Sequence, residues 1–374
     1  MATGSDIHTG ADSEDLQRIS QLDTDGYPVL SIYLDLDPAR FPTPSAREAQ
    51  VGAVLDLARR EAPRATAERV EAWLRADPSI FRGARSLAVF GCAEADVLEA
   101  VGLPEAVEPL VVVDTVPWLE PLAALISPGE WAVAVVSRRG ARLFRGGPTG
   151  ISEFATVHDV VHGRHAQGGW SQANLQRGVE EQVAEHVRGV ALRLLRAHRR
   201  HRFEHLVVIA PDELHSVIER TLHSDLERVL AGILHADLEH APADEIARAV
   251  APVMERAERE RERRLAERVD DALTVGGLAA AGLDEVLALL EHDRVETLLV
   301  AERADVPAGL CPRCGRLSDT DDGRCPFDGA ALDEVDAVEH AVALAAQRSV
   351  PVVVMREQAE WLHRHGGFAA LLRW

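Results

Sequence analysis

The alternation of hydrophobic and polar residues divides the first third of the chain into strands and helices. Residues 46–76 have a helical pattern that we expect to end near Pro78. Residues 1–26 are polar and acidic and predict a flexible tail. Residues 27–128 also contain three strand-like apolar stretches, which are 27–38 (YPVLSIYLDLDP), 86–93 (SLAVFGCA) and 109–116 (PLVVVDTV). Together with the helix they predict an N-terminal α/β domain over 27–128.

A second group of strands surrounds a long helix. Residues 130–157 have the composition of three strands, separated by the turn sequences RRG and GGPTG. Further on, HLVVIAP (205–211) is typical of a buried strand. Between them, hydrophobic residues recur every three or four positions, which predicts an amphipathic helix of about seven turns. These residues are Leu175, Val179, Val183, Val187, Val190 and Leu194.

The same alternation continues to residue 275, so we expect a middle α/β domain over 129–275. A helix is predicted over 212–226 and a strand over 232–240. One long helix is predicted over 244–274, with Pro252 as the place where it could bend.

Residues 276–374 predict a third α/β domain with a repeated helix–strand pattern. The stretch 282–302 (GLDEVLALLEHDRVETLLVAE) is typical of a helix followed by a strand, and 337–355 repeats the pattern. The stretch 366–374 (GGFAALLRW) predicts a last short strand. A polar insert with three cysteines, 311–329, separates the two helix–strand pairs.

Charge is distributed unevenly along the chain. The formal net charge is −21, and every basic residue other than histidine is an arginine. Residues 138–202 nevertheless contain twelve arginines and five acidic residues. Such a segment either faces a phosphate-bearing partner or is a solvated helix face. The chain has no apolar run of membrane-spanning length and no secretory pattern at its start, so we expect a cytoplasmic protein with no membrane or DNA partner.

The insert 311–329 (CPRCGRLSDTDDGRCPFDG) has the spacing of a zinc ribbon. Cys311 and Cys314 form a Cys-x2-Cys knuckle, and Cys325 begins a second one in which Asp328 occupies the place of the last cysteine. Zinc accepts carboxylate as well as thiolate ligands. The insert therefore predicts a structural zinc site, with a metal-free loop as the alternative.

The stretch 164–177 (RHAQGGWSQANLQR) precedes the long helix of the middle domain. Gly168 and Gly169 either make a tight, flexible connection or allow Gln172 to reach a substrate from outside. Ser171 could cap the helix and leave Gln172 at its N-terminus.

Three features of the chain occur in the order found in the archaeo-eukaryotic release factor superfamily, which includes class-1 termination factors, Pelota and the peptidyl-tRNA hydrolases of ribosome quality control. They are the loop QGGWSQANLQR before a long helix, the stretch 282–302 at the start of a third domain, and the ending GGFAALLRW. The chain resembles this superfamily over about residues 130–374, and most closely its bacterial members related to the quality-control hydrolases.

The resemblance implies a three-domain α/β protein. Its middle domain would be RNase H-like and carry the glycine–glutamine loop, and its C-terminal domain would be Pelota/L7Ae-like with the zinc-ribbon insert. The implied activity is hydrolysis of peptidyl-tRNA on the ribosome, which makes the ribosome and peptidyl-tRNA the expected partners. A translational GTPase or ATPase is a further partner that the resemblance leaves open.

In this family the loop helps water to attack the ester that joins the peptide to the tRNA. Gly168, Gly169 and Gln172 are then the catalytic candidates, with Gln172 positioning the water. Arg164 and Arg177 would contact phosphate. The remaining RNA contact would be the ring of Trp170, stacked on a base.

Alternatives remain for each of these roles. Gln167 and Gln176 are rival glutamines, the two arginines could pair with nearby acids, and Trp170 could pack on its own domain. Termination factors have contiguous Gly-Gly-Gln, whereas Trp170 and Ser171 intervene here. The alternative function is therefore a non-catalytic, Pelota-like or dormancy-type factor that binds the ribosomal A site. The chain lacks the lysine-bearing stop-codon signature, so we do not expect it to decode.

Overall fold

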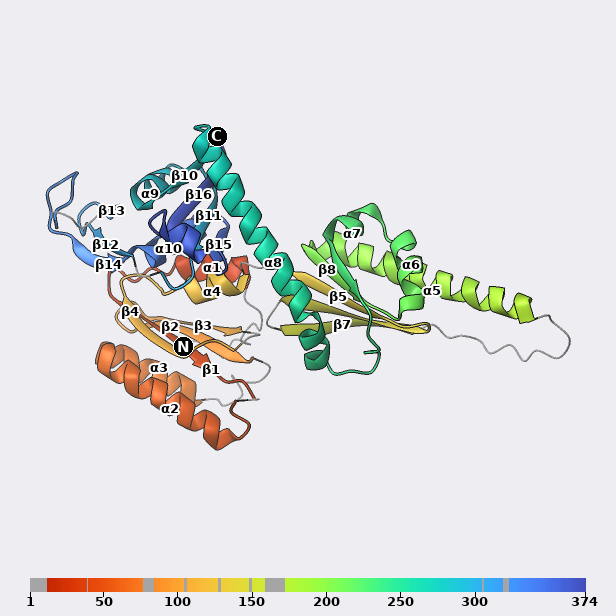
Figure 1. Cartoon of the computed structure of the whole chain (residues 1–374). Coiled ribbons are helices and arrows are strands. Elements are labelled where there is room, and N and C mark those ends of the chain that lie inside the picture. Colours follow the sequence, from red (N-terminus) through yellow and green to blue (C-terminus); the bar gives the residue numbers. More distant parts are fainter. Residues whose placement is uncertain are drawn as a thin grey trace. The chain divides into compact units, whose positions relative to one another are not determined.

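The chain folds into two compact units, one of which contains both the N-terminal and the C-terminal thirds of the sequence (Figure 1). The first unit combines Met1–Ser127 with Arg259–Trp374, and the second is Pro128–Glu258. The structure is a computed structural model, and for residue 158 and residues 172–180 it describes the backbone only. It describes residues 12–38, 40–76, 84–103, 106–126, 129–147, 150–158, 172–304, 306–318 and 323–374.

The N-terminal third builds an antiparallel sheet in the order β3-β2-β1-β4. The predicted strands at 27–38, 86–93 and 109–116 are confirmed, and β3 is an addition that the sequence analysis missed. Helices α2 and α3 cover one face of this sheet (Figure 1). The bounds are β1 Val29–Asp35, β2 Ser86–Cys92, β3 Val97–Leu103, β4 Leu110–Asp114, α2 Pro44–Glu61 and α3 Arg64–Ala76.

The single helix predicted over 46–76 is wrong, because the chain breaks between α2 and α3. Ala62 follows α2 with φ −95° and ψ 158°, which is extended backbone. The residue before a proline is disfavoured in the helical region, and Pro63 follows Ala62. Pro63 therefore ends the first helix and a second one starts directly after it.

The flexible tail predicted over 1–26 is also wrong for its described part, residues 12–26. Helix α1 (Ser13–Ser20) begins after Asp12, whose side chain accepts hydrogen bonds from the backbone N–H groups of Glu14 and Asp15. Leu16 and Ile19 of α1 are buried in the core that also contains α4 (Glu120–Ile126). Spaced three residues apart, these two side chains give the helix one apolar side that the acidic composition concealed.

The C-terminal third builds a mixed sheet in the order β10-β16-β11-β15, with β11 parallel to β15. The predicted pair of helix–strand units and the last strand at 366–374 are confirmed. A short three-stranded sheet, β13-β12-β14, carries the insert. The bounds are β10 Ala279–Ala281, α9 Leu283–Glu291, β11 Val295–Ala301, β12 Pro307–Leu310, β13 Leu317–Ser318, β14 Asp333–Asp336, α10 Ala337–Gln347, β15 Val352–Met355, α11 Ala359–His363 and β16 Phe368–Leu372.

The second unit has a five-stranded sheet in the order β7-β6-β5-β8-β9. Strands β5, β6 and β7 form the predicted antiparallel meander, and β8 and β9 run parallel to β5. Helix α8 is unbroken across Pro252, as one long helix was predicted. The bounds are β5 Trp131–Val136, β6 Gly140–Gly147, β7 Gly150–His158, α5 Gln172–His201, β8 His205–Ile209, α6 Asp212–Thr221, α7 Ser224–Val229 and β9 Leu230–Leu234. Helix α8, Ala243–Thr274, begins in the second unit and ends in the first.

The helix predicted over 212–226 is divided into α6 and α7. Leu222 is extended, with ψ 140°, and the His223 side chain accepts a hydrogen bond from the backbone N–H of Asp225. This cap starts a new helix and explains the division. The strand predicted over 232–240 is β9, which begins and ends earlier in the chain. None of the described helices is long and apolar enough to cross a membrane.

Candidate functional sites

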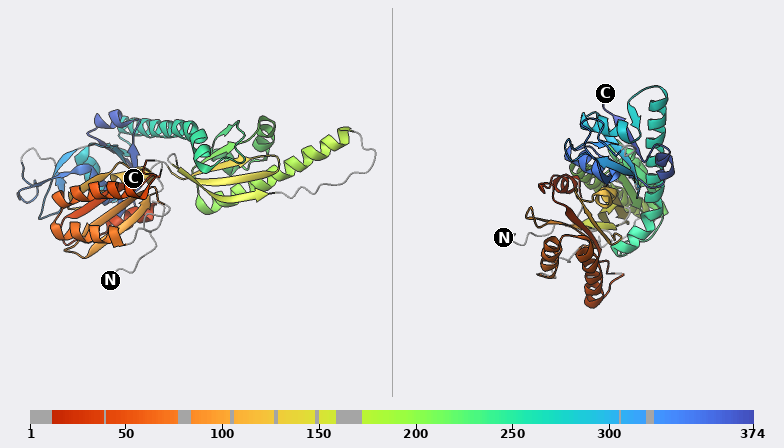
Figure 2. Two further views of the ribbon diagram at one scale, coloured as in Figure 1. Left: turned by 90° about the horizontal axis from the view of Figure 1, so that it is seen from below. Right: turned by 90° about the vertical axis from the view of Figure 1, so that its left-hand side faces the viewer.

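The glycine–glutamine loop connects β7 to α5 in the second unit. Gly168, Gly169, Arg164 and Trp170 lie outside the described residues. Helix α5 begins at Gln172, as predicted for a glutamine at a helix N-terminus. Figures 1 and 2 show the first turns of α5 extending beyond the ends of the sheet strands. The backbone of Gln172 is therefore at the tip of this projection, and that of Arg177 is in its second turn.

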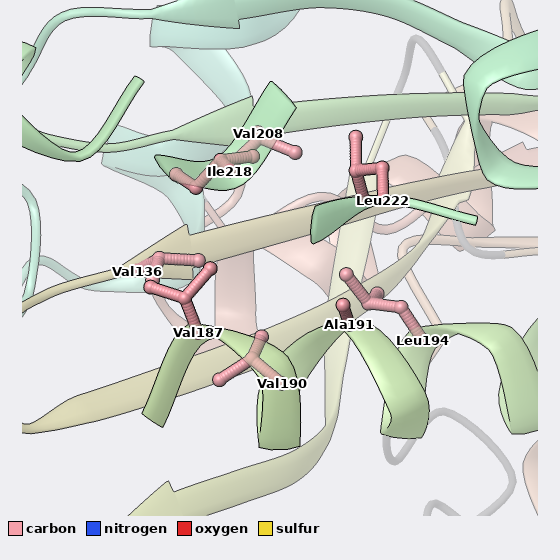
Figure 3. Close-up of a pocket in the computed structure, with 8 residues that line it drawn as sticks. All are labelled: Val136, Val187, Val190, Ala191, Leu194, Val208, Ile218 and Leu222. Carbon is pink, nitrogen blue, oxygen red and sulfur yellow. The ribbon is translucent and has the colours of Figure 1, made fainter. Parts of the chain in front are cut away.

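The second half of α5 fixes this projecting helix to the sheet. Val187, Val190, Ala191 and Leu194 are buried in the core on one side of the sheet. Figure 3 shows these four side chains around an apolar pocket in the core. The other residues that line the pocket are Val136, Val208, Ile218 and Leu222. The predicted hydrophobic periodicity of α5 is thus confirmed from Val183 onward.

The basic segment 138–202 contains two kinds of arginine. On the sheet side, Arg142 is paired with Glu153 at 2.6 Å and donates to the backbone carbonyl of Ala241 at 2.6 Å. On α5, the arginines from position 188 onward are exposed. The segment is therefore not uniformly available to a partner, and the largest group of its exposed arginines lies on α5.

The first half of the cysteine insert forms a tight turn between β12 and β13. The backbone N–H of Gly315 donates to the carbonyl of Cys311 at 2.9 Å, and the N–H of Cys311 donates to the carbonyl of Arg316 at 2.9 Å. Gly315 has φ 70°, a conformation that glycine adopts without strain. Cys314 lies directly before this glycine and is exposed.

The second half has the same backbone arrangement. The N–H of Gly329 donates to the carbonyl of Cys325 at 2.9 Å, and the N–H of Cys325 donates to the carbonyl of Ala330 at 2.8 Å. Gly329 has φ 72°. Asp328 therefore occupies the position that corresponds to Cys314 in the first turn.

The four candidate ligands of the insert converge. One ligand atom from each of Cys311, Cys314, Cys325 and Asp328 lies within 4.8 Å of all the others. The two sulfurs of Cys314 and Cys325 are 3.7 Å apart, and the Cys311 sulfur is 3.5 Å from Asp328. A tetrahedral zinc ion with standard bond lengths requires ligand separations of about 3.8 Å for sulfur–sulfur and about 3.5 Å for sulfur–oxygen pairs. These two separations agree with the required values and all four ligand atoms lie within 4.8 Å of one another, so the cluster could hold a metal ion.

The carboxyl group of Asp328 is kept ionised by its surroundings. The backbone N–H of Ala330 donates to Oδ1 at 2.9 Å, which lowers the pKa of the Asp328 carboxyl below its usual value. Cys311 and Cys325 are buried, so the cluster faces solvent on the side of Cys314 and Asp328. An ionised carboxylate is the form that binds a cation.

Comparisons with known proteins agree with the resemblance found in the sequence. Residues 117–255 match the model of Bacterial archaeo-eukaryotic release factor family 10. Peptide chain release factor subunit 1 of Archaeoglobus fulgidus is 25% identical over 280 residues, which is 68% of this chain and 68% of that protein.

Three solved structures are similar over nearly the whole chain. The archaeal translation termination factor aRF1 is 18% identical, with 96% of each chain covered and a TM-score of 0.26. Archaeoglobus fulgidus Pelota is 14% identical, with 98% of this chain and 93% of that chain covered and a TM-score of 0.36. Dom34 of S. cerevisiae, a translation termination-like factor, is 11% identical, with 98% and 94% covered and a TM-score of 0.42.

Because these TM-scores are low, the likeness rests on the two sequence matches. Residues 117–255 are similar to a bacterial family of archaeo-eukaryotic release factors, and 68% of the chain is similar to a peptide chain release factor subunit.

Proposed function

We propose that this protein is a release factor-like peptidyl-tRNA hydrolase that acts on the ribosome, in the cytoplasm. The observation that supports this function is the family match over residues 117–255, which includes the glycine–glutamine loop and the whole of α5. A helix that begins at the loop glutamine and projects from a packed domain can carry Gln172 into a site formed by another molecule.

The chemistry is hydrolysis of the ester between the peptide and the tRNA. The oxygen of water forms a bond to the ester carbonyl carbon, the bond to the tRNA oxygen breaks, and that oxygen takes up a proton. The amide of Gln172 would orient the water and stabilise the developing oxyanion. Gly168 and Gly169 would let the loop backbone approach RNA more closely than a Cβ permits.

Two kinds of contact would hold the RNA around this loop. Arg164 and Arg177 would form charge-assisted hydrogen bonds with phosphate groups. Trp170 would stack on a base, an interaction that every base can make.

A structural zinc ion in the insert is the second part of the proposal. Cys311, Cys314, Cys325 and Asp328 would hold it, because their donor atoms lie within 4.8 Å of one another and are the types that zinc accepts. A bound zinc ion would join the two turns of a short segment that has little core of its own.

The hydrolase function is tested by replacing the glutamine. Gln172→Ala should lower single-turnover release of peptide from ribosome-bound peptidyl-tRNA by about two to three orders of magnitude, the usual cost of losing one donor to an oxyanion. Gln176→Ala, one helical turn further along, is the matched control and should have a small effect. Release at the wild-type rate by Gln172→Ala would refute the role of Gln172, and ribosome binding without release by the wild-type protein would favour the non-catalytic A-site factor instead.

The zinc site is tested by native mass spectrometry of the purified protein, which should contain about one zinc per chain. Asp328→Asn keeps an oxygen that can accept the Ala330 N–H but removes the charge, so zinc affinity should fall at least about tenfold. Asp328→Cys should hold zinc as tightly or more tightly, because thiolate is the softer ligand. Asp333→Asn, an exposed acid on β14, is the control. Metal-free wild-type protein whose fold is unchanged by Cys314→Ser would refute a structural zinc ion.

A further inference from the structure

The outer face of α5 carries a group of arginines with no acidic residue among them. Residues 188–202 contain six arginines and no acidic residue, in a chain whose net charge is −21. The face is made by five exposed arginines of the helix, which we call the α5 arginine face. They are Arg188, Arg193, Arg196, Arg199 and Arg200.

Helix geometry places these five side chains together. At 100° per residue they fall within about 140° of the helix circumference, opposite the buried face of Val187, Val190 and Leu194. Arg188 and Arg200 are separated by about 18 Å along the axis, at 1.5 Å per residue. The helix is held by its apolar side, so the arginines form a fixed row on its solvent side.

These arginines differ from others of the same unit in their partners. Arg138 is paired with Glu213 at 3.0 Å, and Arg228 contacts Asp225. Arg199 reaches Asp225 only at 4.0 Å. In the part of the chain that the structure describes, the other four arginines of the face have no carboxylate within ion-pair distance. The positive charge of the face is therefore not neutralised locally.

The geometry points to RNA as the ligand of this face: we propose that the α5 arginine face binds the phosphate backbone of ribosomal RNA. This rests on the proposed function and names the surface, distinct from the loop, that holds the protein on its substrate. A row of guanidinium groups about 18 Å long matches a partner with repeated negative charge. A protein partner would need an apolar centre, and the face offers only Leu192, which is 55% exposed.

The experiment compares two double charge reversals in the full-length protein. Arg193→Glu with Arg196→Glu alters the face, and Arg248→Glu with Arg256→Glu alters two exposed arginines of α8 in the same unit. Both change the net charge equally. Binding to a fluorescent RNA hairpin and to purified bacterial ribosomes is measured over a range of salt concentrations.

Reversal on α5 should weaken binding at low salt by at least about tenfold and flatten the slope of log affinity against log salt by about 1.4–1.8, since two phosphate contacts are lost. The α8 reversal should change both much less. If the two reversals weaken binding equally, the loss is explained by the change in net charge alone, and the proposal is overturned. A loss on Leu192→Ala as large as that of the α5 reversal would identify a protein partner and also overturn it.

Hairpin binding requires no peptidyl-tRNA, so it separates this proposal from the hydrolase function. Binding through α5 by a protein that releases no peptide would refute the hydrolase and keep the RNA-binding face. Conversely, the protein could release peptide while the α5 reversal leaves its affinities for the hairpin and the ribosome unchanged. That result would refute the RNA-binding face and keep the hydrolase function.

Discussion

Glu339 on α10 joins the C-terminal third of the first unit to the N-terminal third. Its carboxylate accepts hydrogen bonds from the backbone N–H groups of Leu119, at 2.6 Å, and Glu120, at 3.1 Å, where α4 begins. Glu339 is only 1% exposed, and burial raises the pKa of its carboxyl well above the usual value. Replacing this side chain therefore tests both the contact and its dependence on pH.

Two substitutions separate the hydrogen bonds from the charge. Glu339→Ala leaves two buried N–H groups without an acceptor, at about 1–3 kcal/mol each, so the free energy of unfolding should fall by about 2–6 kcal/mol. Glu339→Gln costs less, because one oxygen of Glu339, Oε2, already accepts from both N–H groups, at 2.6 and 3.2 Å. An amide oxygen in that place can keep both bonds.

The pH dependence has a definite sign. Between the usual carboxyl pKa and the raised pKa of Glu339, the folded protein keeps a proton that the unfolded chain has released. Stability from this group is therefore complete at low pH and is lost as pH rises through the folded-state pKa, by at most about 1.4 kcal/mol per pH unit. Glu339→Gln cannot titrate, so it should gain stability relative to the wild type as pH rises through this window.

The assay is urea unfolding of both proteins from pH 4 to pH 8, together with amide hydrogen exchange of α4 at neutral pH. Exchange at Leu119 and Glu120 should accelerate in Glu339→Ala and less in Glu339→Gln. Glu334→Gln, on the exposed part of β14, is the control. A wild-type minus Glu339→Gln difference that is constant with pH, or α4 exchange unchanged in Glu339→Ala, would refute this reasoning.

Two further substitutions test the packing of α5 and α8. Leu194→Ala, 2% exposed, should lower the free energy of unfolding of the second unit by about 2–5 kcal/mol, whereas Leu192→Ala should change it by less than about 0.5 kcal/mol; thermal unfolding distinguishes them. Glu262→Ala removes the carboxylate that accepts from the backbone N–H groups of Arg356, Glu357 and Gln358, so amide exchange in this segment should accelerate while that of α5 stays unchanged.

Most strands could be predicted because their apolar runs are buried on both faces. Every residue of β1, β2 and β5 is buried, and such runs are conspicuous in a sequence. Strand β3 was missed because Glu99 and Gly102 interrupt its apolar residues, and its first four residues are only half-buried. Its pairing with β2, from Ser86 opposite Leu103 onward, decides its conformation. That information is tertiary and is absent from a local pattern.

The two candidate sites differ in how far the sequence determines them. The cysteine cluster was predictable because each half is a local turn, fixed by a glycine directly after Cys314 or Asp328. The sorting of arginines was not, because Arg142 meets Glu153 only through the register of β6 and β7. Counting charge over 138–202 could indicate a basic segment but not that five of its exposed arginines lie on one face of α5.

The N-terminal helix α1 provides the last prediction, because its sequence looked like a tail and its structure is a packed helix. Ile19 is fully buried and Leu16 is 7% exposed. Outside the apolar contact, the Ser20 carbonyl accepts a hydrogen bond from the Gln347 side chain of α10 at 2.7 Å. Ile19→Ala should therefore lower the free energy of unfolding of the first unit by about 2–5 kcal/mol, because removal of the buried side chain leaves a cavity in the core. Ser13→Ala, exposed in the same helix, is the control for helix propensity. Equal urea midpoints for the two variants would mean that α1 does not contribute to this core, and residues 12–26 would then behave as the tail that their composition predicts.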